Sequence, residues 1–111
     1  MAEKKRIIRL MFTRIKEAYY ELSEEEQQEF MRKDREKMES LGYKLLYMID
    51  CSWSNDKWQF IGVEEWPNME SIEKISKFHE EELNVSKYGE YKTYLGTLVY
   101  DDYSQEGVTN K

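Results

Sequence analysis

The only histidine of the chain, His79, is the residue best suited to proton transfer. A helix predicted from Met69 to about Leu83 places it near the middle of the apolar helix face, which should pack toward a sheet. Because imidazole titrates near neutral pH, a partly buried neutral histidine can act as a general base or bind a metal or heme iron. The alternative is a core histidine that bonds a backbone carbonyl or a tyrosine hydroxyl.

An aspartate on another predicted helix should face the same space as His79. The apolar residues of a helix from Ser23 to about Leu41 define its inner face, and Asp34 falls among them. Such a carboxylate could orient the imidazole or divide a proton transfer with it. The alternatives are a pairing of Asp34 with a first-strand arginine, or a rotated helix on which Asp34 meets water.

Aromatic side chains make up 14% of the chain, including nine Tyr and three Trp. Rings with polar tips suit a pocket for a flat, partly polar ligand, although aromatic residues at strand spacing also suit a core or a dimer interface. A hydroxyl from Tyr88, Tyr91 or Tyr94 could stabilise a developing oxyanion, and we take Tyr91 as the third catalytic candidate. The predicted ligand-binding residues are Tyr19, Tyr20, Tyr47, Phe60, Trp66, Ile75 and Tyr94.

The elements that would position these residues follow from periodicity and capping signals. Ser23 and Glu26 fit a capping box at the start of the first helix, Gly42 fits its end, and Asn68 fits the cap of the second. Alternating apolar residues predict strands at 6–15, 43–53, 58–66 and 91–103, with helices at 23–41 and 69–83 and a loose tail at 104–111. The segment 16–22, with its two adjacent tyrosines, is a predicted loop that could form a lid.

The order strand, helix, strand, strand, helix, strand predicts one domain over residues 1–111, with its core at about 6–103. Right-handed crossovers then give the α+β, ferredoxin-like βαββαβ fold, a four-stranded antiparallel sheet with two helices on one face. The other face also carries apolar residues, so the simplest cover is a second copy about a two-fold axis. Because side chains alternate along a strand, either Glu64 or Glu65 must point inward, where it could bind Arg9 or Arg14 across that dimer. Cys51 fits a small core residue.

Composition limits the partners and the location. Asp and Glu number 23 against 17 Lys and Arg, a net charge of -6 that opposes binding to nucleic acid. No apolar run approaches the roughly 18 residues of a membrane span, and the basic start lacks the cleavage site of a signal peptide, so a cytoplasmic protein is expected. One Cys and one His cannot build a structural zinc site, and no metal or cofactor is expected. The expected partners are a second copy of the chain and a small hydrophobic or aromatic molecule.

Three segments carry a resemblance to known proteins. They are AYYELSEEEQQEF (residues 18–30), VEEWPNMESI (63–72) and YGEYKTYLG (88–96). In order and spacing they resemble the dimeric α+β barrel superfamily, in which two ferredoxin-like chains close their sheets into one barrel, and most closely a small family of uncharacterised proteins within it. Members of that family carry an aromatic-x-x-Leu-Ser start to the first helix and a Trp near the end of the third strand, here Tyr19, Leu22, Ser23 and Trp66.

The superfamily that these segments resemble hosts heme-degrading monooxygenases, cofactor-free oxygenases, lactone isomerases, polyketide cyclases and proteins with no known reaction. Its heme-degrading members use an Asn on the first strand with a Trp and a His on the second helix. Here the first strand has no Asn and the second helix has His79 but no Trp, which speaks against heme degradation. Its polyketide cyclases use a His and a Tyr at the second helix and the following loop, where His79 and Tyr88 or Tyr91 lie.

The resemblance and the residues together predict a cofactor-independent enzyme of monooxygenase, cyclase or isomerase type. Its substrate would be a small hydrophobic or aromatic molecule, held in a pocket between sheet and helices. The alternatives are a non-catalytic ligand-binding or interaction protein and a heme-binding protein.

Overall fold

Four antiparallel strands form the sheet of the computed structural model, which describes residues 6–99. The strands are β1 (Ile7–Ile15), β2 (Lys44–Asp50), β3 (Phe60–Trp66) and β4 (Gly89–Gly96). Their order in the sheet is β2-β3-β1-β4, so the first and last strands of the chain are neighbours. This order confirms the predicted ferredoxin-like α+β fold.

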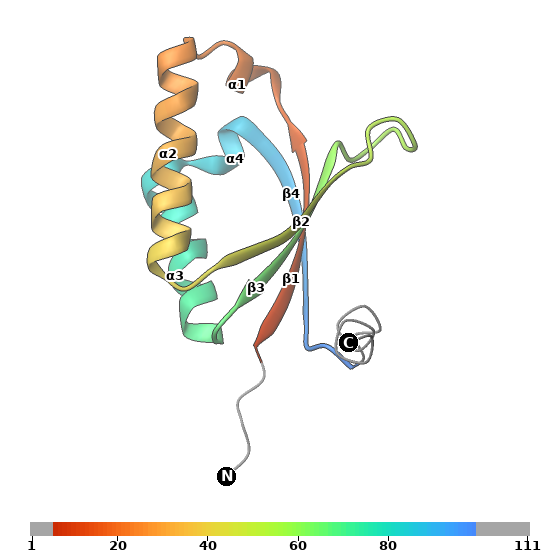
Figure 1. Cartoon of the computed structure of the whole chain (residues 1–111). Coiled ribbons are helices and arrows are strands. Elements are labelled where there is room, and N and C mark those ends of the chain that lie inside the picture. Colours follow the sequence, from red (N-terminus) through yellow and green to blue (C-terminus); the bar gives the residue numbers. More distant parts are fainter. Residues whose placement is uncertain (1–5, 100–111) are drawn as a thin grey trace, which may run out of the picture.

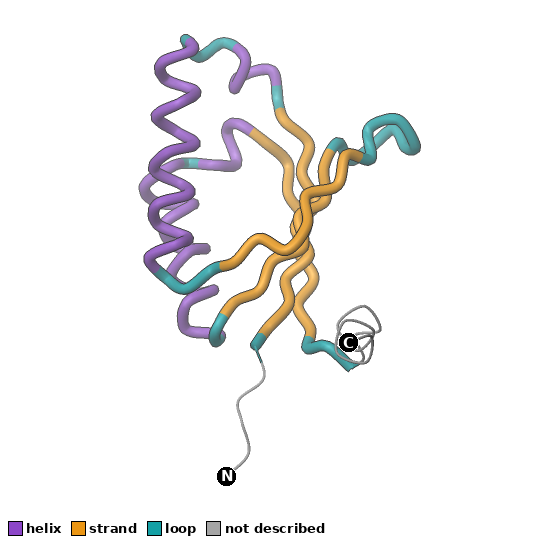
Figure 2. The backbone as a smooth tube through the Cα atoms, in the orientation of Figure 1, coloured by secondary structure: helices purple, strands orange, loops and turns teal. Residues whose placement is uncertain are grey.

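Every helix of the described residues lies on one face of this sheet (Figure 1). The long helices are α2 (Glu24–Ser40) and α3 (Met69–Phe78), the short ones are α1 (Glu17–Tyr20) and α4 (Val85–Tyr88), and the π-helix η1 (His79–Leu83) continues α3. Figure 2 shows the strands as a twisted layer whose other face has no helix over it within residues 6–99. None of the helices in this range is long and apolar enough to cross a membrane.

Local signals in the sequence set the helix ends. The side chain of Ser23 accepts a hydrogen bond from the Glu26 backbone N–H, and the Glu26 carboxylate accepts one from the Ser23 backbone, which is the predicted capping box. Asn68 caps α3 with its side chain, also as predicted. After α2, Gly42 adopts a φ of 90°, and a Cβ there would lie 2.9 Å from Pro67 Cγ. This turn therefore requires glycine both for its backbone angle and for space.

Several element boundaries differ from the predictions. The predicted loop at 16–22 contains the short helix α1, and β3 begins at Phe60 instead of residue 58. β2 ends at Asp50 instead of residue 53, because the Asp50 carboxylate accepts hydrogen bonds from the backbone N–H and the hydroxyl of Ser52 and turns the chain. The last strand begins at Gly89 and ends at Gly96. Residues 100–103 of the predicted strand and the predicted tail at 104–111 lie outside the described residues.

A β-bulge in β2 changes which of its residues face the helices. Leu45 pairs with Glu64, but Tyr47 pairs with Val63, so the register shifts at Leu46. Because residues alternate between the two faces of a strand, the extra residue puts Leu45 on the helix side and Tyr47 on the other. Simple alternation, which assigned both side chains to one face, is wrong here.

The apolar core lies between β3 and α3. Trp66 and Ile75 are completely buried and Ile72 almost so. Their partly buried neighbours are Ile7, Met38, Leu41, Tyr43 and Phe78. Full burial of one large apolar side chain contributes about 1.5–3 kcal/mol, so this cluster holds α3 firmly against the sheet. It thereby positions His79, the first residue after α3.

Candidate active site

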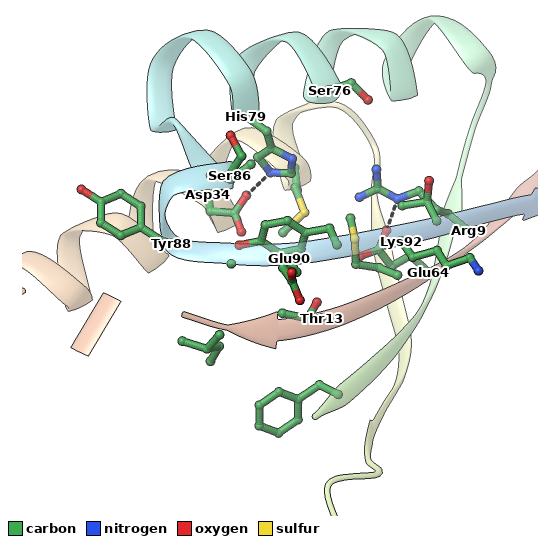
Figure 3. Close-up of a pocket in the computed structure, with 18 of the residues that line it drawn as sticks. Arg9, Thr13, Asp34, Glu64, Ser76, His79, Ser86, Tyr88, Glu90 and Lys92 are labelled. Carbon is green, nitrogen blue, oxygen red and sulfur yellow. Dashed lines mark hydrogen bonds and ion pairs between the residues drawn. The ribbon is translucent and has the colours of Figure 1, made fainter. Parts of the chain in front are cut away.

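Two helices bring the predicted acid–base residues into direct contact. His79 Nε2 lies 2.6 Å from Asp34 Oδ1 (Figure 3). The two side chains are 13% and 22% exposed, so most of each is shielded from water. Asp34 lies in the middle of α2, and His79 directly follows α3. Sequence periodicity predicted that both side chains face the same space, and in the structure they are in direct contact.

A change of helix type occurs at His79. The chain passes from α3 into the π-helix η1, which ends at Asn84 with a left-handed φ of 51°. A π-helical turn holds one extra residue, and such turns are often found at functional sites. The helix predicted at 69–83 is therefore not one α-helix, because residues 79–83 are wound differently. A helical wheel with α-helical spacing is valid only as far as His79.

The contact with Asp34 determines which nitrogen of His79 can react. Within residues 6–99, Asp34 is the one hydrogen-bond partner of the His79 ring. A neutral imidazole that donates its Nε2–H to a carboxylate presents Nδ1 as the acceptor. The carboxylate also stabilises the imidazolium that forms when Nδ1 takes up a proton. The pair is therefore arranged for general acid–base chemistry.

Tyr91 on β4, the third predicted catalytic residue, keeps its proton over a wide pH range. Burial, with smaller contributions from the charge of Asp34 and from Tyr19, raises the pKa of Tyr91 to about 12. At physiological pH the hydroxyl can donate a hydrogen bond to a developing negative charge. Folding favours the neutral phenol. The contribution of Tyr91 to the free energy of unfolding is therefore fully present below its ordinary pKa of 10.0 and is lost as the pH rises toward 12.

Glycine at the start of β4 leaves room for this hydroxyl. A Cβ at Gly89 would lie 2.6 Å from the hydroxyl oxygen of Tyr91 and 2.7 Å from its Cζ. The backbone of Gly89 is extended, with φ at -165°, so any residue could adopt it. Space alone requires glycine here, and Gly89 is a positioning residue for Tyr91.

We expect Gly89→Ala to lower the pKa of Tyr91 from about 12 toward its ordinary value of 10.0, because the added methyl displaces the hydroxyl from the place where it is desolvated. An NMR titration of ring-labelled tyrosine measures this pKa. Gly96→Ala, on the same strand, is the control, since a Cβ at Gly96 meets no atom within 4 Å. An unchanged pKa of Tyr91 in Gly89→Ala would show that this glycine does not position the hydroxyl.

A cavity of about 1320 Å³ lies between the sheet and the helices, and the three catalytic candidates line it. Most of its apolar wall comes from these residues of both layers: Met11, Ile15, Phe30, Met38, Leu45, Met48, Ile72 and Leu95. Ligand pockets usually have volumes of about 300–1,000 Å³, apolar walls and a few convergent polar groups. This cavity is larger than that range, has a mainly apolar wall, and has room for a small hydrophobic molecule.

Two of the predicted ligand-binding residues, Tyr19 and Phe60, line this cavity. Tyr19 belongs to an aromatic group in which its ring packs edge-on to Phe30 at 5.8 Å and Phe30 packs on Tyr88 at 5.3 Å between ring centroids. Tyr88, the alternative oxyanion donor, therefore also lies on the cavity wall. Burial is the main cause that raises the pKa of Tyr19.

The other five predicted ligand-binding residues lie elsewhere. Trp66 and Ile75 are buried in the core. Tyr47 faces away from the helices because of the bulge in β2. Tyr94 also faces away from them, because it lies three residues after Tyr91 on β4 and alternate residues of a strand point to opposite faces. Tyr20 is 60% exposed on α1. None of these five is among the described residues that line the cavity.

Arg9 and Glu64 form a second polar cluster on the cavity wall, in contact with Trp66, and its place in this cavity was not predicted from the sequence. Arg9 Nε donates to Glu64 Oε1 at 2.7 Å, and the same oxygen accepts from Trp66 Nε1 at 2.9 Å. Arg9, one of the two arginines expected to meet the inward carboxylate, does pair with Glu64, but between neighbouring strands of one chain and not across a dimer. Alternation indicated that Glu64 or Glu65 points inward, but the arginine that meets it depends on strand register, for which the sequence carries no local signal.

Solved structures share this fold at low sequence identity. A variant of chlorite dismutase from Candidatus Nitrospira defluvii matches with a TM-score of 0.70 at 12% identity, over 90% of this chain and 43% of that chain. The same enzyme in complex with imidazole gives 0.67 at 9% identity, over 94% and 44%. A protein described as a candidate chlorite dismutase gives 0.63 at 16% identity, over 86% and 44%. The chain therefore shares the ferredoxin-like α+β fold of these structures.

The chain spans less than half the length of these structures. No protein-family model matches it, and no curated protein matches its sequence. The resemblance to one small uncharacterised family within the superfamily therefore stays a prediction. At identities of 9–16% the likeness extends to the fold alone. A shared fold does not imply a shared function, which depends on the residues of the site.

Metal binding is the remaining chemistry to consider at this site. Within the described range of the chain, no three His, Cys, Asp or Glu side chains are arranged as a group that could hold a metal ion. The polar groups that line the cavity include the Asp34–His79 pair, the Arg9–Glu64 pair and the Tyr91 hydroxyl, together with several lysines, glutamates, serines and threonines.

Proposed function

We propose that this chain is an enzyme that moves protons on a small hydrophobic or aromatic molecule without a bound cofactor. The observation that carries the proposal is the 2.6 Å contact between His79 and Asp34 on the wall of a largely apolar cavity. Proton transfer at carbon needs a base, a group that orients the base, and a donor at the developing oxyanion. His79, Asp34 and Tyr91 are suited to these three roles.

The simplest reaction for this set is removal of a proton from the carbon next to a carbonyl group. Nδ1 of His79 takes the proton, the electron pair of the C–H bond forms the double bond of an enolate, and the Tyr91 hydroxyl donates to the enolate oxygen. Asp34 stabilises the imidazolium. Return of the proton to another carbon gives an isomerisation, and attack on a second carbonyl of the same molecule gives a cyclisation. Reaction of the carbanion of a CH2 group with dioxygen as a co-substrate gives a hydroperoxide, which loses water to leave a new carbonyl group, so that one oxygen atom enters the product and the other leaves as water.

Native mass spectrometry of protein freshly purified from cells comes first, because it identifies a small molecule retained in the cavity. That molecule, or a panel of aromatic ketones, is then incubated with the protein in deuterated water. We expect exchange of hydrogen for deuterium next to the carbonyl with the wild-type chain and far slower exchange with His79→Gln. Binding without exchange by the wild-type chain contradicts catalysis and favours the non-catalytic ligand-binding protein.

A heme-binding protein is the second candidate, because a histidine lines a large cavity. The contact with Asp34 is compatible with it, because a histidine that ligates a metal usually donates its other ring N–H to a carboxylate, which leaves Nδ1 of His79 for an iron. Addition of hemin tests it. Axial ligation by His79 predicts a heme absorbance spectrum that changes in His79→Ala, and an identical spectrum in the two proteins excludes it.

We also propose that a second copy of the chain covers the uncovered face of the sheet. The apolar side chains on that face are Ile8, Leu10, Phe12, Tyr47, Ile49, Ile61, Val63 and Tyr94. Three of them, Tyr47, Ile49 and Tyr94, are 58%, 44% and 51% exposed, which is unusual for large apolar groups on one continuous sheet face. A two-fold axis would let each sheet cover the other.

Light scattering after size exclusion is expected to give twice the chain mass of 13.6 kDa. Tyr47→Lys should shift the protein to the monomer, because it places a charge on the uncovered face at a position too exposed to destabilise a single chain. Gln28→Lys adds the same charge to an exposed position of α2 and should leave the dimer intact. A wild-type mass of one chain would contradict the proposal.

A further inference from the structure

The cluster of Arg9, Glu64 and Trp66 contains one unused hydrogen-bond donor. Arg9 is only 3% exposed, its Nε donates to Glu64, and its guanidinium lies 5.1 Å from the centre of the Trp66 ring. Among the residues that the structure describes, its Nη2 is buried with no hydrogen-bond partner. Folded proteins leave few buried donors unpaired, since each one destabilises the fold, and those that remain call for an explanation such as a bound group.

This unused donor belongs to the same cavity as the acid–base pair. Arg9 and Glu64 line the cavity together with His79 and Asp34. Figure 3 shows the Arg9–Glu64 contact and the Asp34–His79 contact as two separate polar points of one site. A molecule held in this cavity can therefore meet the catalytic pair with one part and the guanidinium with another.

The charges of the cluster determine which ligand atom fits Nη2. The Glu64 carboxylate balances the charge of Arg9, and its Oε1 already accepts two N–H groups. A second carboxylate beside Glu64 would be repelled, whereas a neutral carbonyl oxygen accepts the hydrogen bond without that cost. Three methionines, Met11, Met38 and Met48, line the cavity, and their unbranched side chains can move to admit a ligand to Nη2.

We infer that Arg9 Nη2 is a subsite for a neutral carbonyl oxygen of the substrate, at a distance from the carbon on which His79 acts. The inference rests on the proposed function and makes it more specific. The substrate would be a hydrophobic or aromatic molecule with at least two carbonyl groups, one bound by Arg9 and one beside Tyr91. Arg9 would then fix the orientation of the molecule in a cavity whose other walls are mainly apolar.

Binding of two matched compounds, acetonaphthone and ethylnaphthalene, tests the subsite without any need for turnover. They have nearly the same shape and differ in one carbonyl oxygen. Calorimetry should show that the wild-type chain binds the ketone about tenfold or more tightly, the usual effect of a hydrogen bond to a charged donor. The double variant Arg9→Met with Glu64→Gln removes the guanidinium without leaving a buried charge and keeps an acceptor for Trp66 Nε1. This preference should fall about tenfold in the double variant, which retains only what the Tyr91 hydroxyl contributes.

The controls separate this inference from the proposed function. His79→Gln should keep the preference for the ketone, because Arg9 is intact, and near-UV circular dichroism should show that the double variant keeps its tertiary structure. An undiminished preference in the double variant, no preference in the wild-type chain, or no binding of either compound overturns the subsite. Deuterium exchange at the wild-type rate in His79→Gln contradicts the proposed function instead and leaves the Arg9 subsite in place.

Discussion

His79→Gln is expected to lower kcat by about 10²- to 10⁴-fold, the usual contribution of a well-placed general base. Glutamine is close to histidine in size and can still bond Asp34, but it cannot take up a proton near neutral pH. Affinity for the ligand should therefore change little. The rate of deuterium exchange at saturating ligand measures kcat, and calorimetry measures affinity. Weaker binding with an unchanged kcat would show that His79 only contacts the ligand.

Asp34 should act through His79 and is best described as a positioning residue. Asp34→Asn removes the charge that stabilises the imidazolium and puts an amide, which donates as well as accepts, in place of the acceptor that orients the ring at 2.6 Å. We expect kcat to fall with little change in KM, and Asp34→Glu to recover part of the loss. The matched control is Glu81→Gln, which neutralises an exposed carboxylate of η1. Equal losses in Asp34→Asn and Glu81→Gln would mean that net charge, and not the contact with His79, sets the rate.

Glu64→Ala is expected to be the most destabilising single substitution among the charged residues named above, with a loss of about 3–5 kcal/mol in the free energy of unfolding. Glu64 is 6% exposed and Arg9 is 3% exposed, so the substitution leaves a charge buried without a counterion. It also leaves the Nε of Arg9 and the Nε1 of Trp66 without their acceptor. Urea denaturation measures the change.

Two controls bear on this result. Glu90→Ala removes a carboxylate that also pairs with cations, Arg14 and Lys57, but at the surface, so its effect should be a small fraction of the loss in Glu64→Ala. Arg9→Met combined with Glu64→Gln should recover most of the stability, because no charge is then left buried. Equal effects of the two alanine substitutions would show that water reaches the Arg9–Glu64 pair in solution.

Much of the fold could be predicted because its signals are local. The Ser23 capping box, the Asn68 cap and the alternation of apolar residues in strands all depend on residues a few positions apart. For this order of elements, the preference for right-handed crossovers allows only a few topologies. The short helix α1 was missed because its four residues carry no periodic pattern and its first residue follows Lys16, whose side chain makes no cap.

The candidate site was predicted in part for the same reason. Helical periodicity is sufficient to say that Asp34 and His79 lie on faces that turn toward the sheet. It cannot say that their side chains touch, because that depends on how α2 and α3 pack and on the change to a π-helix at His79. Trp66 was predicted to bind the ligand, but it lies in the core. The sequence cannot distinguish a residue of the cavity wall from a core residue, because both are apolar and face inward.

The sequence by itself thus determined the element order, the helix caps and the inward-facing candidates His79 and Asp34, all of which follow from interactions between near neighbours. Only the tertiary structure decided the partner of Glu64, the side of the sheet on which Tyr47 lies, and the space at Gly89 that holds the Tyr91 hydroxyl. Arg9 and Glu64 are 55 residues apart in the chain. Their pairing depends on strand register, which is set by the packing of the whole sheet and not by the residues beside either one.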